Sequence, residues 1–233
     1  MTAPRLQPPF WQHDAYTLRR LAGALRRLIA GLPPVQRTAP RAVDLGAGDA
    51  PYRPLFEAAG YDYLACDIDA PAPLRIVPGQ PLALAAGSAA LVLSFQVLEH
   101  VWDLDAYLGE AHRLLADDGR LVLSTHGTWL YHPHPTDFRR WTRTGLQAEL
   151  QSRGFVCERT VGLVGPLAWT TQFRAIGAAQ LLRRFPLLGS LLAGLLSSLY
   201  HLRMIVEDAL TPAGWIDDNA AVYLVQARKA TAR

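Results

Sequence analysis

Residues 124–142, STHGTWLYHPHPTDFRRWT, carry the densest set of side chains able to do chemistry. His126 comes first, directly after an apolar run, and imidazole is well suited to take a proton near neutral pH. Two arginines near the end are typical of sites for phosphate or carboxylate, because guanidinium groups pair with such anions bidentately. The segment predicts acid–base work by His126. It also predicts substrate recognition by His132, His134, Asp137, Arg139, Arg140 and Trp141.

Two other interpretations of this segment stay open. A metal site is possible from His132, His134 and Asp137, but no tetrahedral set of ligands is evident, so we expect no metal ion. Alternatively, the segment is a structural loop pinned by prolines, and this role is compatible with substrate binding. In that interpretation the side chains that pack over the core are Trp129, Phe138 and Trp141.

A second group suited to ligand binding is the run VDLGAGDAPYRPLF at 43–56. Gly46 and Gly48 stand between an apolar strand pattern and the start of a helix, where a glycine turn lets a ligand touch the backbone. Dinucleotide-binding turns require a third glycine five positions after the first, and Pro51 occupies that position here. This pattern argues against a nicotinamide oxidoreductase.

Asp67 ends the next strand pattern, YDYLACDID. An acidic side chain at this place can accept hydrogen bonds from both hydroxyls of a ribose. Asp69 competes for the same role, and an ordinary acidic residue in a turn is the simpler alternative.

Strand and helix patterns alternate along the chain, which predicts one α/β domain over 1–233. We expect strands at 41–47, 61–69, 89–95, 120–127, 155–165 and 220–228, and helices at 14–30, 53–60, 101–119 and 143–154. The expected fold is doubly wound and Rossmann-like, with a mostly parallel seven-stranded sheet, helices on both faces and a helical insertion before the last strand. Ligands of such sheets bind beyond the carboxyl ends of the strands.

Four pieces, in order and at matching spacing, resemble the class I S-adenosylmethionine-dependent methyltransferases, in particular the small-molecule group with a VLEHV segment. The pieces are VDLGAGDAPY, YLACDID, LVLSFQVLEHV and RLLADDGRLVLSTH. The resemblance covers about 41–164 and the last strand. It implies S-adenosyl-L-methionine as cofactor. It also implies which residues contact each part of the cofactor. The methionine end is contacted by Asp44, Gly46, Ala47 and Gly48, the ribose by Asp67, and the adenine by Ile68, Gly79 and Gln80. The residues expected beneath the cofactor are Ser94, Phe95 and Gln96.

The implied reaction moves an activated methyl group, so the enzyme mainly has to align the acceptor and exclude water. A hydroxyl acceptor often needs a base, for which His126 and His100 are the candidates. His100 in LEHV has a structural alternative as a residue that holds the loop, and Glu99 beside it as a structural acid. The chain departs from the family pattern at Ala50, where a third glycine is common, and at Ala90, where an acid often opens the strand.

Residues 166–218 form an apolar insertion in which 185–202 has no charged residue. This length approaches that of a membrane span, but a span would separate the last strand from its own sheet. We therefore expect a lid, an interfacial membrane contact or a homodimer interface, with a helix buried on the domain as the alternative. The basic amphipathic pattern at 14–30, within an N-terminal helical extension over 1–34, favours peripheral contact with an anionic membrane.

Composition sets the remaining expectations. The chain has 233 residues and a net charge of +3 without basic tracts, so no nucleic-acid partner is expected. Cys66 and Cys157 lie in apolar stretches and are expected to be buried free thiols, and no cleavable signal peptide is evident. We expect a cytoplasmic methyltransferase, with the inner membrane face as the alternative location, acting on a hydroxyl of an apolar, lipid-linked or sugar-type small molecule. A non-catalytic binding or assembly subunit of the same fold is the alternative.

Overall fold

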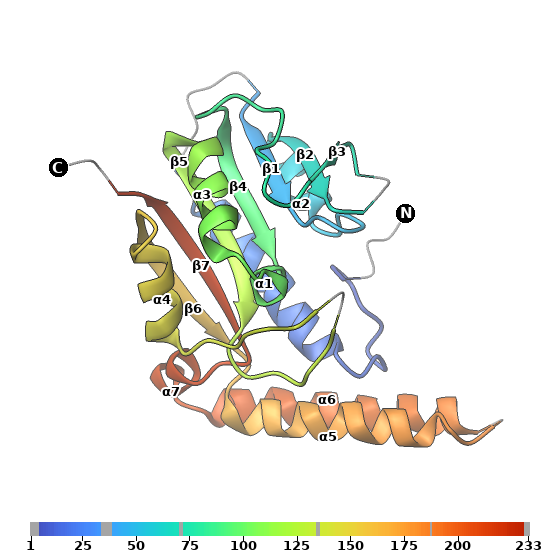
Figure 1. The fold of residues 1–233 in the computed structure, drawn as a ribbon. Helices are drawn as coiled ribbons and strands as arrows, with labels where there is room; N and C mark the ends of the chain where they lie inside the picture. The colour runs from blue at the N-terminus through green and yellow to red at the C-terminus, as the bar shows by residue number, and fades with distance from the viewer. Residues whose placement is uncertain (1–4, 34–38, 70–71, 134–135, 187, 231–233) are drawn as a thin grey trace.

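The computed structural model describes residues 5–33, 39–69, 72–133, 136–186 and 188–230. A seven-stranded sheet in the order β3-β2-β1-β4-β5-β7-β6 forms its centre (Figure 1). The strands are β1 Arg41–Leu45, β2 Asp62–Asp67, β3 Leu74–Arg75, β4 Ala89–Phe95, β5 Leu115–His126, β6 Phe155–Leu163 and β7 Val222–Lys229. All pairs are parallel except those of β7, which runs antiparallel to both β5 and β6. The structure confirms the expected doubly wound, mostly parallel sheet.

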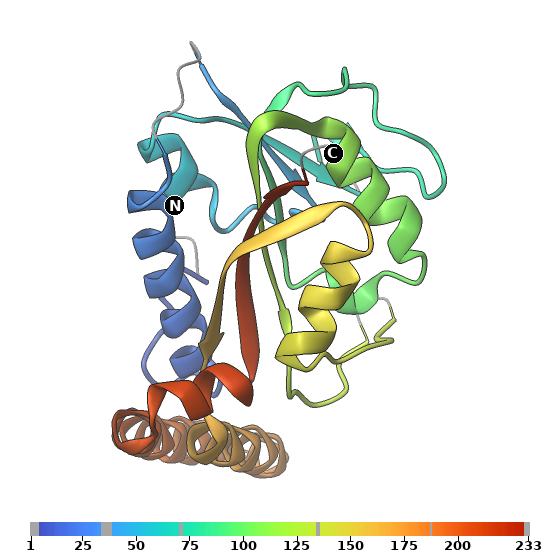
Figure 2. The same cartoon turned by 90° about the vertical axis from the view of Figure 1, so that its left-hand side faces the viewer.

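Helices cover both faces of the sheet, as Figure 2 shows. Helices α1 (Ala15–Ala30) and α2 (Arg53–Ala58) lie on one face, and α3 (Leu104–Leu114) and α4 (Arg143–Gln151) on the other. Each face has its own apolar core, because the central strand β4 is buried along its whole length and needs cover on both sides. Helix α1 is thus an integral part of the domain rather than an appendage.

The ends of four strands meet at one edge of the sheet. The glycine turn follows β1, Asp67 ends β2, and the 3₁₀ turn η1 (Leu98–His100) follows β4. His126, the last residue of β5, pairs with Val222, which pairs in turn with Leu163 at the end of β6. The helical insertion therefore leaves the sheet at the same edge as the candidate site.

The insertion is a helical hairpin followed by a short helix. Helices α5 (Pro166–Leu182) and α6 (Gly189–Leu210) pack along each other and extend past the sheet, and α7 (Ala213–Asp218) leads back to β7 (Figure 1). The hairpin is held to α1 by buried polar contacts, in which Tyr16 donates to Asp208 at 2.7 Å and Thr17 donates to Gln172 at 3.2 Å.

Several local expectations are wrong. The helix expected over 101–119 ends at Leu114, because Leu115 pairs with Ala89 and joins β5. Gly119 fits that strand closely, since a Cβ there would lie 2.9 Å from the carbonyl oxygen of Ala90. The two-residue strand β3 carries no recognisable pattern, and Cys157 is half-buried because β6 is an edge strand.

Candidate active site

A cleft of about 1530 Å³ opens along the carboxyl ends of the strands. Single small-molecule pockets usually measure about 300–1,000 Å³, so this cleft has room for two ligands side by side. The glycine turn, Asp67 and the turn at Gly79 lie along one part of its wall, and His100, His126 and His132 along another. The start of α1, which contributes Thr17 and Leu21, also lines it.

The turn after β1 brings bare backbone to the cleft. Gly46 and Gly48 have φ values of 79° and 54°, in the left-handed region that glycine adopts without strain. A Cβ on Gly46 would lie 2.6 Å from Val97, so no larger side chain fits there. Ala50, at φ 51°, occupies a third left-handed position where glycine would be the less strained choice.

Asp44 lies behind this turn and is almost completely buried, at 2% exposure. Its Oδ2 accepts a hydrogen bond from the Tyr63 hydroxyl, whereas Oδ1 has no partner among the described residues. Burial raises the pKa of this carboxyl to about 6, despite the Tyr63 contact. A buried acceptor without a partner beside an open cleft is suited to bind a cationic donor group of a ligand.

The Asp67 carboxylate faces the cleft from the end of β2. Its Oδ2 accepts from the backbone N–H of Gly48 at 2.7 Å, and its Oδ1 accepts from that of Asp69 at 3.1 Å. Each carboxylate oxygen has two lone pairs, so both keep acceptor capacity for a ligand. Ile68, Gly79 and Gln80 line the same part of the cleft.

The residues at the end of β4 and directly after it, 94–96, differ in whether they line the cleft. Phe95 and Gln96 line the cleft, and Gln96 holds a φ of 57° while its side chain donates to Ser124 at 3.0 Å. Ser94 does not line the cleft; its hydroxyl donates to the Tyr107 hydroxyl at 2.8 Å, because Tyr107 itself donates to the Leu45 carbonyl oxygen. Tyr107 is a cleft residue that no sequence pattern indicated.

His126 lies in a buried contact with the carboxylate of Glu99. Nδ1 of His126 lies 2.8 Å from Oε1 of Glu99, although the two groups are not aligned as a hydrogen bond, and Oε2 accepts from Thr125 at 2.8 Å. Burial opposes ionisation of Glu99, but the contacts with His126 and Thr125 outweigh it and hold the pKa of the carboxyl below its usual range. Glu99 is thus an ionised carboxylate directly behind the imidazole.

An aromatic group surrounds His126. Trp129 stacks on its ring at 5.0 Å between centroids, and His132 meets it edge-on at 4.8 Å. His132 also contacts His100 edge-on at 5.0 Å. Burial, with a smaller contribution from His126, lowers the pKa of His132, so this histidine is neutral at physiological pH.

Most of the other residues expected to bind substrate are turned away from the cleft. Arg139 donates to the carbonyl oxygens of Val101 and Trp102. Arg140 pairs with Asp137 at 2.5 Å and 2.6 Å and donates to Leu130 at 2.8 Å. Arg139, Arg140, Asp137 and the buried Trp141 do not line the cleft, and His134 lies outside the described residues. The guanidinium groups expected to bind a substrate anion instead hold the loop that carries His132.

The described residues fit S-adenosyl-L-methionine. The unpartnered Oδ1 of Asp44 is suited to an ammonium group, the glycine turn admits a ligand against the backbone, and Asp67 keeps acceptors for ribose hydroxyls. The mutually contacting His100, His126 and His132 line the same cleft as its histidine end, and this group is left for a second ligand.

Comparisons with known proteins agree with this geometry. The chain is 31% identical over 88 residues to a probable S-adenosylmethionine-dependent methyltransferase of Mycolicibacterium smegmatis, covering 35% of this chain and 34% of that protein. It is 27% identical over 150 residues to one of Mycobacterium tuberculosis, covering 55% of each. The chain thus spans about half the length, or less, of these relatives.

A solved S-adenosylmethionine-dependent methyltransferase from Mesorhizobium loti has the same fold, with a TM-score of 0.55, 16% identity, and coverage of 94% of this chain and 98% of that one. The family model described as a methyltransferase domain matches residues 16–159, more than half of the chain. The chain therefore belongs to the methyltransferase domain family.

Proposed function

We propose that this protein transfers the methyl group of S-adenosyl-L-methionine to a hydroxyl of an apolar, lipid-linked acceptor at a membrane face. The observation that carries the proposal is the pairing of two groups in one cleft. A buried carboxylate with a free acceptor lies beside the glycine turn, and a carboxylate-backed histidine lines the other end.

The cofactor, when bound, supplies a methyl group already activated by its sulfonium. Asp44 and the backbone at Gly46, Ala47 and Gly48 hold the methionine end, and Asp67 holds the ribose. Ile68, Gly79 and Gln80 border the adenine. Phe95 and Gln96 would lie beneath, and Ser94 holds Tyr107, which itself lines the cleft.

His126 takes the proton of the acceptor hydroxyl. Glu99 stabilises the imidazolium that forms, because an ionised carboxylate lies 2.8 Å from its Nδ1. Trp129 fixes the plane of the ring by stacking on it and excludes water from that side. His100 and His132 complete the wall against which the acceptor lies.

Aromatic side chains connect this end of the cleft to the helical hairpin. Trp129 contacts Phe173 of α5 edge-on at 5.9 Å, and Phe173 contacts Trp169 at 5.4 Å. An acceptor whose reactive hydroxyl lies at His126 and whose apolar part follows these rings would reach the surface at α5. This path favours an apolar, lipid-linked acceptor over a free sugar.

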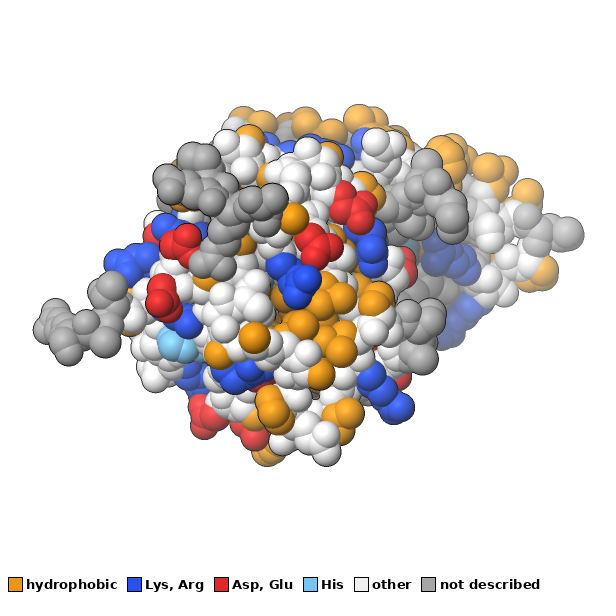
Figure 3. Space-filling model, turned by 90° about the horizontal axis from the view of Figure 1, so that it is seen from above, with side chains coloured by type: hydrophobic (Ala, Val, Ile, Leu, Met, Phe, Trp, Pro, Cys, Tyr) orange, Lys and Arg blue, Asp and Glu red, His pale blue; other side chains and the backbone are white. Residues whose placement is uncertain are grey.

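The hairpin has the surface of an interfacial membrane contact. Leu191, Leu195, Leu199 and Leu202 share one side of α6 and are each more than half exposed. Helix α6 is long and apolar enough to span a bilayer by length and composition, yet α5 packs along it and β7 returns to the sheet. Its end projects beyond the domain, with apolar and basic side chains exposed (Figure 3).

The charge of the hairpin fits an anionic membrane. No acidic residue occurs from 166 to 206, whereas Arg174, Arg183, Arg184 and Arg203 do. Basic residues near an anionic surface each contribute about 1 kcal/mol of binding. A homodimer through the leucine side is the competing use of this surface.

The function is tested by incubating the full chain with methyl-labelled S-adenosyl-L-methionine and a lipid extract of the native host. Label is expected in the lipid fraction with wild type and not with His126→Ala. Label confined to water-soluble acceptors would overturn the lipid assignment. Absence of transfer together with retained cofactor binding would support the non-catalytic alternative.

A further inference from the structure

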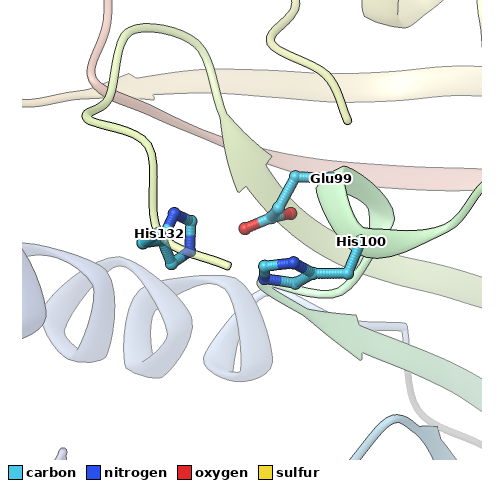
Figure 4. A group of neighbouring side chains, drawn as sticks. All are labelled: Glu99, His100 and His132. Atoms are coloured by element: carbon cyan, nitrogen blue, oxygen red, sulfur yellow. The ribbon is translucent and has the colours of Figure 1, made fainter. Parts of the chain in front are cut away.

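Three potential metal ligands meet at the histidine end of the cleft. Glu99 and His100 come from the turn after β4, and His132 comes from the loop after β5 (Figure 4). One ligand atom of each lies within 4.8 Å of the others, with Glu99 buried and the two histidines half-buried. In Figure 4 the carboxylate points into the space between the two rings. This set differs from the one that the sequence suggested, which joined His132 to Asp137 and His134.

The tautomer of His100 is fixed by its neighbour. Its Nδ1 lies 2.5 Å from the carbonyl oxygen of Thr136, and a carbonyl oxygen only accepts, so Nδ1 carries the proton. The lone pair of the neutral ring is therefore on Nε2. Metal-binding histidines commonly donate their other ring N–H to a carbonyl or carboxylate in this way.

His132 is oriented by the Asp137–Arg140 pair. Its Nδ1 lies 3.4 Å from Oδ2 of Asp137, and its backbone N–H donates to the same oxygen at 3.0 Å. The Arg140 guanidinium, which only donates, also lies 3.5 Å from this Nδ1. Metal binding through Nε2 therefore requires the tautomer of His132 that carries its proton on Nδ1, toward Asp137. The ion pair of Asp137 with Arg140 thus orients the imidazole of His132, as residues that hydrogen-bond to metal ligands do in metal sites.

The carboxylate of Glu99 can still bind an ion, although each of its oxygens already has a neighbouring side chain. Oε2 accepts from Thr125 and Oε1 faces His126, but each oxygen has a second lone pair. A fully buried carboxylate beside two imidazole rings is a strong attractor for a cation, because little water competes for it.

We propose that Glu99, His100 and His132 bind a divalent transition-metal ion. Two histidines and one carboxylate with open positions are typical of sites for zinc, iron or cobalt rather than calcium. The ligand atoms of a tetrahedral zinc ion lie about 3.3 Å apart, so the distances between the ligand atoms of Glu99, His100 and His132 must shorten by about 1.5 Å or less. His132 stands on a loop, where a rotation of the side chain supplies this closure.

The open positions of the ion would face the cleft. Binding of the metal does not depend on the proposed function, but its use does: an ion there would hold the acceptor oxygen beside His126 and lower the pKa of a bound hydroxyl. This would place the acceptor and its base within one rigid group of side chains.

The test uses the untagged full chain, freed of metal by a chelator and titrated with cobalt(II). One cobalt per chain with visible absorption is expected. Glu99→Gln and His132→Asn are each expected to weaken binding about tenfold or more, whereas His112→Asn, a half-buried histidine on α3, should leave it unchanged. Near-ultraviolet circular dichroism shows whether each variant is folded.

Two outcomes would overturn the inference: no cobalt binding at millimolar concentration, or binding that folded His132→Asn retains in full. A calorimetric titration with S-adenosylhomocysteine on the same preparation separates the two proposals. Retained cofactor binding without metal binding would remove the metal site and leave the proposed function standing.

Discussion

The carboxylate of Glu99 lies 2.8 Å from Nδ1 of His126, and neither side chain is more than 6% exposed. Glu99 lies in the turn after β4 and His126 ends the neighbouring parallel strand β5, so the sheet itself brings the two residues together. The contact gives His126, which we propose as the general base, an ionised partner on the wall of a cleft that a glycine turn and Asp67 also line.

His126→Ala should lower turnover by about a hundredfold or more, the usual contribution of a general base, while cofactor affinity stays unchanged. Steady-state methyl transfer and calorimetry with S-adenosylhomocysteine measure the two effects separately. His112→Ala is the matched control. Full activity in His126→Ala would assign the ring a packing role and leave the chemistry to alignment alone.

Glu99→Gln should lower turnover and shift the acidic limb of the pH–rate profile, because a neutral amide stabilises the imidazolium less than a carboxylate does. Gln keeps the acceptor for Thr125, so the fold should persist. A lower rate with an unchanged pH profile would contradict an electrostatic role for Glu99.

Asp67→Ala should weaken S-adenosylhomocysteine binding by one to two orders of magnitude, since charge-assisted hydrogen bonds are worth about 1.5–3 kcal/mol each. Asp69→Ala, two residues further and with its side chain more exposed, should bind as wild type does. If Asp69→Ala instead carries the loss, the ribose contact belongs to that residue.

Asp44→Asn should make the ligand-free protein more stable and the cofactor bind less tightly. Burial raises the pKa of Asp44 to about 6 from an ordinary 3.8, so folding is penalised as pH rises above 3.8 and the penalty is complete above 6. The difference corresponds to about 3 kcal/mol at most. Melting temperatures of wild type and Asp44→Asn should therefore coincide near pH 3.5 and separate by pH 7. Equal melting temperatures at pH 7 would contradict the buried, ionised carboxylate.

Leu195→Glu combined with Leu199→Glu should abolish co-sedimentation with vesicles of phosphatidylglycerol. Both leucines are more than half exposed on α6, and a charge there cannot enter the apolar part of a bilayer. Val156→Glu, on the edge strand β6, is the matched control. Wild type that sediments no better than the double variant, but forms dimers that the variant lacks, would favour the dimer interface.

Much of the fold was predictable because the apolar strands and the helix periodicity are local signals. The glycine turn and Asp67 follow from short motifs at strand ends, and the structure places both at the cleft. The end of α3 was not predictable from local sequence, because the helix ends where Leu115 pairs with Ala89, which lies 26 positions earlier in the chain.

The histidine end of the cleft could be predicted only in part. His126 stands at the end of its strand, a position that indicates a site residue, but its partner Glu99 lies in the turn after another strand, and nothing in the sequence spacing joins the two. Arg139 and Arg140 looked like anion-binding residues because sequence reports the guanidinium but not the carbonyl oxygens of Val101 and Leu130 that occupy it.

The most direct test of the account is calorimetric titration of the full chain with S-adenosyl-L-methionine and S-adenosylhomocysteine at pH 5 and pH 7.5. The account predicts one molecule per chain, with affinity lower at pH 5 in wild type, because Asp44 takes up a proton below about 6, and independent of pH in Asp44→Asn. Absence of binding at millimolar ligand at both pH values would contradict it.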